Sequence, residues 1–189
     1  MTHPEPSDEE LMNSLRNGDD LALNALIKRW QKPLSTFVLR YTKNHFDASE
    51  LAQETFIRIY QQRKKYRMKG KFSTWMFTIA ANLCRNHARW KSRHPSVAGL
   101  DDEETFSSME AIDPKERPDA AAIRDDEAEH IREAVQELPH DLRTAILLFE
   151  YEALSHAEIA QVLACSPKAV ETRLYRARQI LRKKLEGLL

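Results

Sequence analysis

Apolar residues in the first half of the chain recur every three or four positions, the period of a helix that is buried on one side. The clearest case lies between residues 71 and 93. Its apolar residues fall on a single stripe: Phe72, Trp75, Met76, Ile79, Ala80 and Leu83. The same spacing predicts helices over about 7–17, 21–42 and 48–66. We therefore expect a helical domain whose core contains these aromatic side chains.

Helix starts are marked by capping motifs. A serine or aspartate stands three positions before a glutamate at residues 7–10, 47–50 and 155–158, which is the spacing of a capping box. Ser166 precedes a proline, a pair typical of an N-cap and the first helical position. The chain has only 4 glycines and no long run of alternating β-branched residues. The predicted fold class is therefore all-α, without a glycine-rich phosphate loop.

The second half of the chain predicts a helix-turn-helix. A helix over about 140–150 is followed by a short one within 155–163, a turn at 164–166, and a basic helix over about 167–186. The core side of the basic helix is expected to hold Val170, Leu174, Ala177, Leu181 and Leu185. Its base-edge candidates are Lys168, Glu171, Thr172, Tyr175, Arg176 and Gln179. Its phosphate candidates are Arg173, Arg178 and Arg182.

Between the two helical halves, residues 94–126 lose the helical periodicity and combine prolines with many acids. This composition is typical of a linker rather than of a core. The predicted organisation is therefore a tail at 1–6, a helical domain at 7–93, a flexible acidic linker at 94–126 and a second small helical domain at 127–189.

Charge is segregated along a chain whose formal net charge is zero, with 29 basic and 29 acidic residues. No Asp or Glu occurs from Thr55 to Leu100, whereas the linker is acidic and residues 168–184 are basic again. Two separate basic stretches indicate polyanion binding at two places. The cysteines, Cys84 and Cys165, fit a reducing compartment, and no apolar run approaches the roughly 20 residues of a membrane span. We expect a cytoplasmic protein without membrane insertion, metal or cofactor.

Two long segments resemble a known family. The segment FDASELAQETFIRIYQQRKKY with KGKFSTWMFTIAANLCRNHARWKSR resembles region 2 of extracytoplasmic-function (ECF) sigma factors, and LPHDLRTAILLFEYEALSHAEIAQVLACSPKAVETRLYRARQILRKKL is similar to their region 4. The resemblance implies a non-catalytic subunit that binds core RNA polymerase and directs promoter-specific initiation. It also implies an anti-sigma factor as a partner, and a monomer when free, with the two domains closed together.

The resemblance also assigns roles by position. It implies binding of core polymerase by Asp47, Glu50, Leu51, Gln53, Glu54 and Phe56. It implies recognition of the promoter −10 element by Tyr66, Arg67, Lys69, Lys71, Asn82, Arg85, Asn86 and Arg89, called the −10 set below. It implies recognition of the −35 element by Ser166, Lys168, Glu171, Thr172, Arg173, Tyr175, Arg176 and Arg178, called the −35 set. Glu171 departs from the basic or small polar residue of many relatives, so their −35 preference is not transferred.

Two other functions compete with this one. A stand-alone helix-turn-helix regulator acting as a dimer would explain the second half, but it leaves the acid-free stretch at 55–100 unexplained and lacks an obvious dimerisation helix. An enzyme using the acids at 101–104 as metal ligands is the third reading, although an acidic run in a proline-bearing linker is usually solvated.

Overall fold

The computed structural model describes residues 5–67, 70–94 and 128–186, and every regular element within them is helical, as predicted. The first group comprises α1 (Asp8–Arg16), α2 (Leu21–Thr42), α3 (His45–Gln62), the 3-10 turn η1 (Arg63–Lys65) and α4 (Phe72–Arg93). The second group comprises a helix over 128–136, α7 (His140–Glu150), α8 (His156–Val162) and α9 (Pro167–Leu185). Apart from His94, the predicted linker lies outside the described residues.

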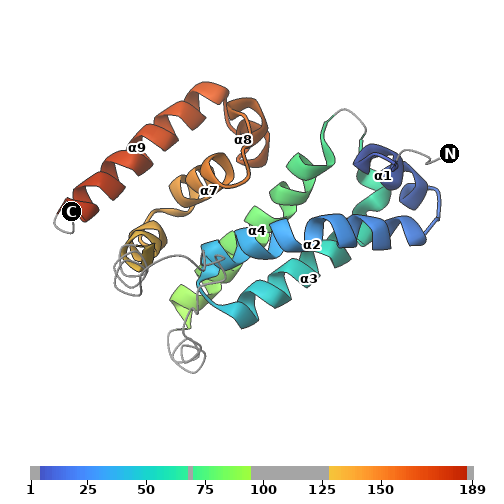
Figure 1. The fold of residues 1–189 in the computed structure, drawn as a ribbon, viewed down its shortest axis with the longest axis horizontal. Coiled ribbons are helices and arrows are strands. Elements are labelled where there is room, and N and C mark those ends of the chain that lie inside the picture. Colours follow the sequence, from blue (N-terminus) through green and yellow to red (C-terminus); the bar gives the residue numbers. More distant parts are fainter. Residues whose placement is uncertain (1–4, 68–69, 95–127, 187–189) are drawn as a thin grey trace, which may run out of the picture.

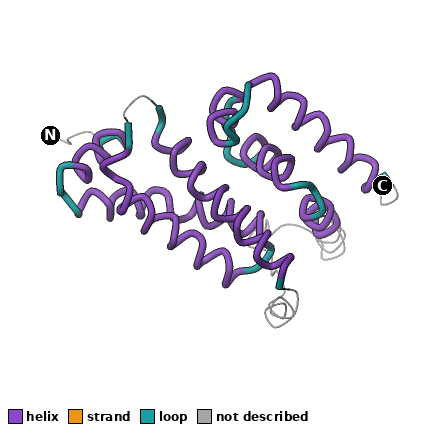
Figure 2. Tube along the Cα trace, turned by 180° about the vertical axis from the view of Figure 1, so that it is seen from behind, coloured by secondary structure: helices purple, strands orange, loops and turns teal. Residues whose placement is uncertain are grey.

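The two groups form two bundles that lie against each other (Figure 1). In the first bundle, α2, α3 and α4 run alongside one another, and α1 lies at one end. In the second bundle, α7 and α8 face α2 and α4, and α9 lies on the far side (Figures 1 and 2). The last helix of the predicted helix-turn-helix is therefore turned away from the first bundle.

Capping side chains begin the helices where the sequence places them. Ser7 Oγ accepts from the Glu10 backbone N–H at 3.2 Å, and the Glu10 carboxylate accepts from the Ser7 N–H at 2.7 Å. The same reciprocal pair joins Ser155 and Glu158, at 3.3 and 2.8 Å. Ser166 also caps α9, but without a reciprocal bond from a glutamate. Each cap satisfies backbone donors that a helix start leaves unpaired, which is worth about 1 kcal/mol.

The predicted start of α3 is wrong. The helix begins at His45 rather than Ala48, because the side chain of Asn44 accepts from the Asp47 backbone N–H at 2.8 Å and acts as the N-cap. Asp47 lies inside the first turn, where it is buried and binds Lys91 of α4, so it forms no capping box. The helix also ends earlier than predicted, at Gln62, and η1 follows it.

The predicted apolar stripe of α4 packs into the core of the first bundle. Phe72 and Met76 are fully buried, and Phe77 packs edge-on against Phe37 of α2, with ring centroids 5.2 Å apart. Trp75 is only partly buried.

In α9, only some of the predicted core residues are buried. Val170, Leu174 and Ala177 are buried, whereas Leu181 and Leu185, toward the end of the helix, are partly exposed.

Hydrogen bonds tie the second bundle to the C-terminal part of α2. Tyr41 Oη lies 2.6 Å from His140 Nδ1, and Arg143 donates to the Tyr41 carbonyl at 3.2 Å. Gln136 donates to the Arg40 carbonyl at 2.9 Å. The chain thus adopts the closed arrangement expected for the free protein.

Candidate nucleic-acid interface

The outer face of α9 presents a group of polar and aromatic side chains near the helix start. All are exposed: Lys168, Glu171, Thr172, Tyr175 and Arg176. Tyr175 is 65% exposed, an unusual position for a large aromatic side chain unless it contacts a partner. Ser166 caps the helix and thereby fixes its start. Because α9 lies on the far side of its bundle, this face is open to a DNA groove (Figure 1).

The remaining arginines of the −35 set are held within the second bundle. Arg173 pairs with Asp141 of α7 at 2.9 Å and donates to Cys165 Sγ at 3.0 Å. Arg178 pairs with Glu150 at 2.8 Å. Arg176, in contrast, has no ion pair within the described part of the chain. The structure therefore leaves Arg176 exposed, whereas Arg173 and Arg178 also hold α9 against α7.

The outer face of α4 carries amide and basic side chains at helical spacing. Asn82, Asn86, Arg89 and Arg93 are exposed and lie one turn apart in the C-terminal half of α4, where they continue the line of Trp75 and Ile79 along the helix. The acid-free stretch of the sequence therefore becomes a continuous amide and cationic surface. Such a surface suits the backbone and bases of a nucleic-acid strand.

Two other cations of the −10 set are bound by acids of the second bundle. Lys71 Nζ lies 2.8 Å from Glu158 Oε1, and Arg85 lies 3.2 Å from Asp141 Oδ1. Hydrogen bonds from Lys71 and then Ser155 lower the pKa of Glu158 to about 2. In this closed arrangement, neither cation is free for an outside ligand.

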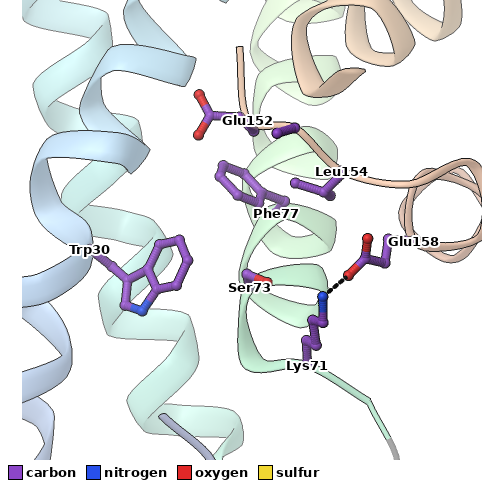
Figure 3. Close-up of a pocket in the computed structure, with 8 residues that line it drawn as sticks. Trp30, Lys71, Ser73, Phe77, Glu152, Leu154 and Glu158 are labelled. Atoms are coloured by element: carbon purple, nitrogen blue, oxygen red, sulfur yellow. Dashed lines mark ion pairs between the residues drawn. The ribbon is translucent and has the colours of Figure 1, made fainter. Parts of the chain in front are cut away.

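A cavity of about 120 Å³ lies beside the first of these ion pairs (Figure 3). Trp30 of α2 and Phe77 of α4 face Leu154, which precedes α8, and the pair between Lys71 and Glu158 bounds one side. Apolar contact between the bundles is therefore incomplete at this point.

The predicted base-capture loop is only partly described. Tyr66 is buried, with its ring 5.1 Å from that of Trp75, and its hydroxyl donates to the Gly70 carbonyl at 3.2 Å. Burial raises the pKa of Tyr66. Arg67 is exposed, and Lys69 lies outside the described residues. Tyr66 thus belongs to the core in this conformation and offers no face to a base.

The predicted polymerase-binding residues of α3 fall into different environments. Glu50 and Gln53 are exposed, and Glu54, half-buried, pairs with Arg58 at 2.7 Å. Leu51 is partly buried and Phe56 is buried. Asp47 is also buried, with its carboxylate 2.8 Å from Lys91 Nζ and 3.4 Å from His87 Nε2. Only part of the predicted set can therefore meet a partner on this surface.

Sequence reasoning missed two large apolar residues on the same helix. Phe46 is 62% exposed and Ile57 is 43% exposed. With Glu50 and Gln53 they are spaced by four, three and four residues and share one outer face of α3, which we call the α3 stripe. Their positions are out of phase with the buried residues of the helix, and that signal was available in the sequence.

Known proteins with the same organisation are found by comparison. The Sigma-70 region 2 family matches residues 26–94, and the Sigma-70 region 4 family matches residues 128–181. The RNA polymerase sigma-H factor of Pseudomonas aeruginosa is 34% identical over 184 residues, covering 96% of this chain and 95% of that protein. The ECF RNA polymerase sigma-E factor of Escherichia coli is 30% identical over 185 residues, covering 97% and 96%. The chain belongs to the ECF sigma factors.

As an ECF sigma factor, the protein directs RNA polymerase to promoters, with core polymerase and promoter DNA as its partners. The first bundle is region 2 and the second is region 4. The family resemblance expected from the sequence is confirmed. A stand-alone helix-turn-helix regulator is not favoured, because relatives of this sigma factor align with nearly the whole chain.

Solved structures share the fold of this ECF sigma factor. CnrH, determined with the cytosolic domain of CnrY, has a TM-score of 0.71 at 23% identity, covering 96% of this chain and 99% of CnrH. The sigma factor RpoE of Bartonella quintana, determined with the anti-sigma factor NepR, has a TM-score of 0.60 at 22% identity, covering 86% and 96%. In the described ranges of this sigma factor, no helix has the length and apolar character needed to cross a bilayer.

Proposed function

We propose that this ECF sigma factor uses three exposed helical faces for three ligands. The α3 stripe binds core polymerase, the outer face of α4 holds the −10 strand, and the outer face of α9 reads the −35 element. One observation carries this proposal: the three faces are exposed on separate helices, and the side chains of each suit the proposed ligand.

For core polymerase, the α3 stripe combines two apolar side chains with a carboxylate and an amide between them. Exposed apolar residues flanked by polar ones are typical of a protein-binding surface. Leu51 and Phe56 support the helix from beneath, and Asp47 fixes its start against α4. Glu54 lies beside the stripe and keeps Arg58 as its ion-pair partner.

For the −10 element, Asn82, Asn86 and Arg89 contact the separated strand, and Arg67 with Lys69 adds positive charge at the capture loop. Extracting a base from the stack costs a few kcal/mol, which contacts to the flipped base offset. Lys71 and Arg85 join this face only when they have left the acids of region 4. Tyr66 takes part either by supporting the loop from the core or after a local rearrangement.

For the −35 element, α9 enters the major groove with its N-terminal part. Arg176 and Lys168 are suited to guanine, and Thr172 and Tyr175 to neighbouring bases or methyl groups. Glu171 pairs with Lys168 at 2.5 Å, so this acid orients the lysine or accepts from a cytosine amino group. Arg173 and Arg178 hold the helix against α7 and lie close to the phosphates.

We also propose that an anti-sigma factor regulates this protein, that the protein acts in the cytoplasm, and that it has no catalytic activity of its own. The likeness to the Bartonella quintana sigma factor, whose structure is a complex with an anti-sigma factor, supports this class of partner. The domain limits we propose are 7–93 for region 2 and 127–189 for region 4, with the acidic segment 94–126 between them.

Transcription in vitro tests the proposal. The chain is mixed with core polymerase and a target promoter, and initiation should require both components. The free protein should shift the promoter weakly at physiological salt, because each domain alone contacts few phosphates. A shift by the free protein as strong as that with core polymerase would instead support a stand-alone DNA-binding regulator.

A further inference from the structure

Charged side chains make much of the contact between the two bundles, and their signs are sorted by bundle. The ion pairs that cross the interface within the described residues are Lys43–Glu129 at 2.5 Å, Lys71–Glu158 at 2.8 Å and Arg85–Asp141 at 3.2 Å. In each of them the cation belongs to region 2 and the acid to region 4. The Arg40 guanidinium also lies over the Tyr151 ring, 3.8 Å from its centroid.

Two of these cations, Lys71 and Arg85, belong to the −10 set. Their partners, Glu158 and Asp141, hold these cations through carboxylate oxygens. Asp141 also holds Arg173 of the −35 set at 2.9 Å, so one carboxylate links DNA-binding cations of both regions. We call Asp141 and Glu158 the closure acids.

We propose that the closure acids act as a substitute for the DNA backbone, so that closure of the two regions and binding of the −10 strand exclude each other. The free sigma factor is thereby kept from binding single-stranded DNA by its own region 4. Binding of core polymerase to the two regions in a separated arrangement releases Lys71 and Arg85 together. This inference rests on the proposed role of α4 in holding the −10 strand.

The interface has the properties of a contact that opens readily. The Lys71 side chain is 72% exposed and that of Asp141 is 43% exposed, so water and salt screen both ion pairs. An ion pair of this kind contributes a factor of about two to five to an equilibrium. The cavity beside Trp30 and Phe77 also interrupts the apolar contact between the bundles at one point (Figure 3). A DNA strand, with one charge on every phosphate, can therefore displace these acids.

The test neutralises the closure acids without changing their shape. The double variant is Asp141→Asn with Glu158→Gln. Glutamine at 158 can still accept from the Ser155 backbone N–H, so the capping box of α8 survives. The control is Glu137→Gln with Glu150→Gln, which removes the same charge from acids that pair with Lys184 and Arg178 inside region 4.

Two quantities are measured on the full chain without polymerase. The first is the radius of gyration by small-angle scattering, which should rise in the double variant only. The second is the affinity for a fluorescein-labelled single strand of mixed sequence, which should increase about 4- to 25-fold in the double variant if both pairs are lost. The control should match the wild type in both. Asp141→Asn alone should show a smaller change in the same direction.

If the double variant and its control have the same radius of gyration and the same affinity, the proposal is overturned. Opening without tighter strand binding also overturns it, because the acids would then not compete with DNA. The role of α4 itself is tested separately by Asn82→Ala with Arg89→Ala, residues that take no part in the interface ion pairs. With core polymerase, that variant should lose promoter opening whether or not closure is regulated by the acids.

Discussion

Asp47 is the one buried carboxylate among the described residues, and its position changes how a mutation there must be interpreted. Asp47→Asn should lower the free energy of unfolding by about 1–3 kcal/mol, because the half-buried Lys91 loses its charged partner. Glu50→Gln, on the exposed side of the same helix, should change it by less than about 0.5 kcal/mol. Urea titrations compare the two variants. Equal losses would mean that the buried ion pair is unimportant for stability.

A second single-residue effect concerns pH. Burial, together with the nearby Arg85, lowers the pKa of His140 from 6.5 to about 4. Between these two pH values the unfolded chain takes up a proton that the folded chain does not, so stability falls as the pH drops from 6.5 toward 4. The loss is at most about 3 kcal/mol. Glu158 adds a further loss below pH 4.5, as the pH approaches its lowered pKa of about 2.

Melting temperatures measured at several pH values check this effect. His140→Gln should have a shallower decline between pH 6.5 and 4 than the wild type, because the variant has no imidazole to protonate. The closed arrangement should weaken as the pH approaches 4, where the ring that faces Tyr41 becomes charged. An identical decline in wild type and variant would assign the pH dependence to other groups.

At the scale of one helix, α3 carries the prediction for polymerase binding. Ile57→Ala and Phe46→Ala should each weaken the affinity for core polymerase by about 1–2 kcal/mol, as expected for apolar residues in a protein interface. Both side chains are exposed in the free chain, Phe46 more than Ile57, so stability should change little. Asn24→Ala, exposed on α2 rather than α3, is the control for competition binding measurements. Full affinity in both variants would show that the α3 stripe is not part of the interface with core polymerase.

The corresponding prediction for α9 separates base reading from helix support. Arg176→Ala should weaken initiation by about 1–3 kcal/mol at promoters whose −35 element it contacts, and should relax the preference for one base pair there. Arg178→Ala should instead weaken binding to all sequences and lower stability slightly, because Glu150 loses its partner. Initiation assays on promoters with single −35 substitutions, with core binding as the control, distinguish the two. Unchanged initiation by Arg176→Ala on every promoter would contradict the face assignment.

Element boundaries were largely predictable because caps and apolar spacing are local. The helix predicted over 21–42 matches α2, including its interior Pro33, and the helices predicted over about 140–150 and 167–186 match α7 and α9. The start of α3 was not predictable in this way. Asn44 competes with Asp47 for the cap, and only the tertiary contact with Lys91 decides between them. The exposed parts of the candidate sites were also predictable from helical spacing.

What could not be predicted depends on residues far apart in the chain. The sequence shows that Lys71, Arg85 and Arg173 are basic, but not that acids of another helix bind them. It places Tyr66 in a binding loop, whereas packing against Trp75 places it in the core. A formal net charge of zero likewise hides the fact that the two bundles attract each other through sorted charges.

For the whole molecule, closure through ion pairs predicts a dependence on ionic strength in the absence of DNA. Raising NaCl from about 0.1 M to about 1 M shortens the screening length from about 10 Å to about 3 Å, which weakens the pairs between the bundles. The radius of gyration should therefore increase with salt, while helix content measured by circular dichroism stays constant. A chain that remains equally compact at both salt concentrations would show that hydrogen bonds such as that between Tyr41 and His140 suffice for closure.

The two thiols of the chain differ in chemical reactivity as a result of where they lie. Cys84 is buried in α4, and burial raises its pKa to about 12, so almost none of it is thiolate at neutral pH. Cys165 is only partly buried, in the turn before α9. A maleimide dye should therefore attach to Cys165 alone in the folded wild-type chain, without any engineered cysteine. The natural sequence thus supplies a single labelling site beside the helix that is proposed to read the promoter.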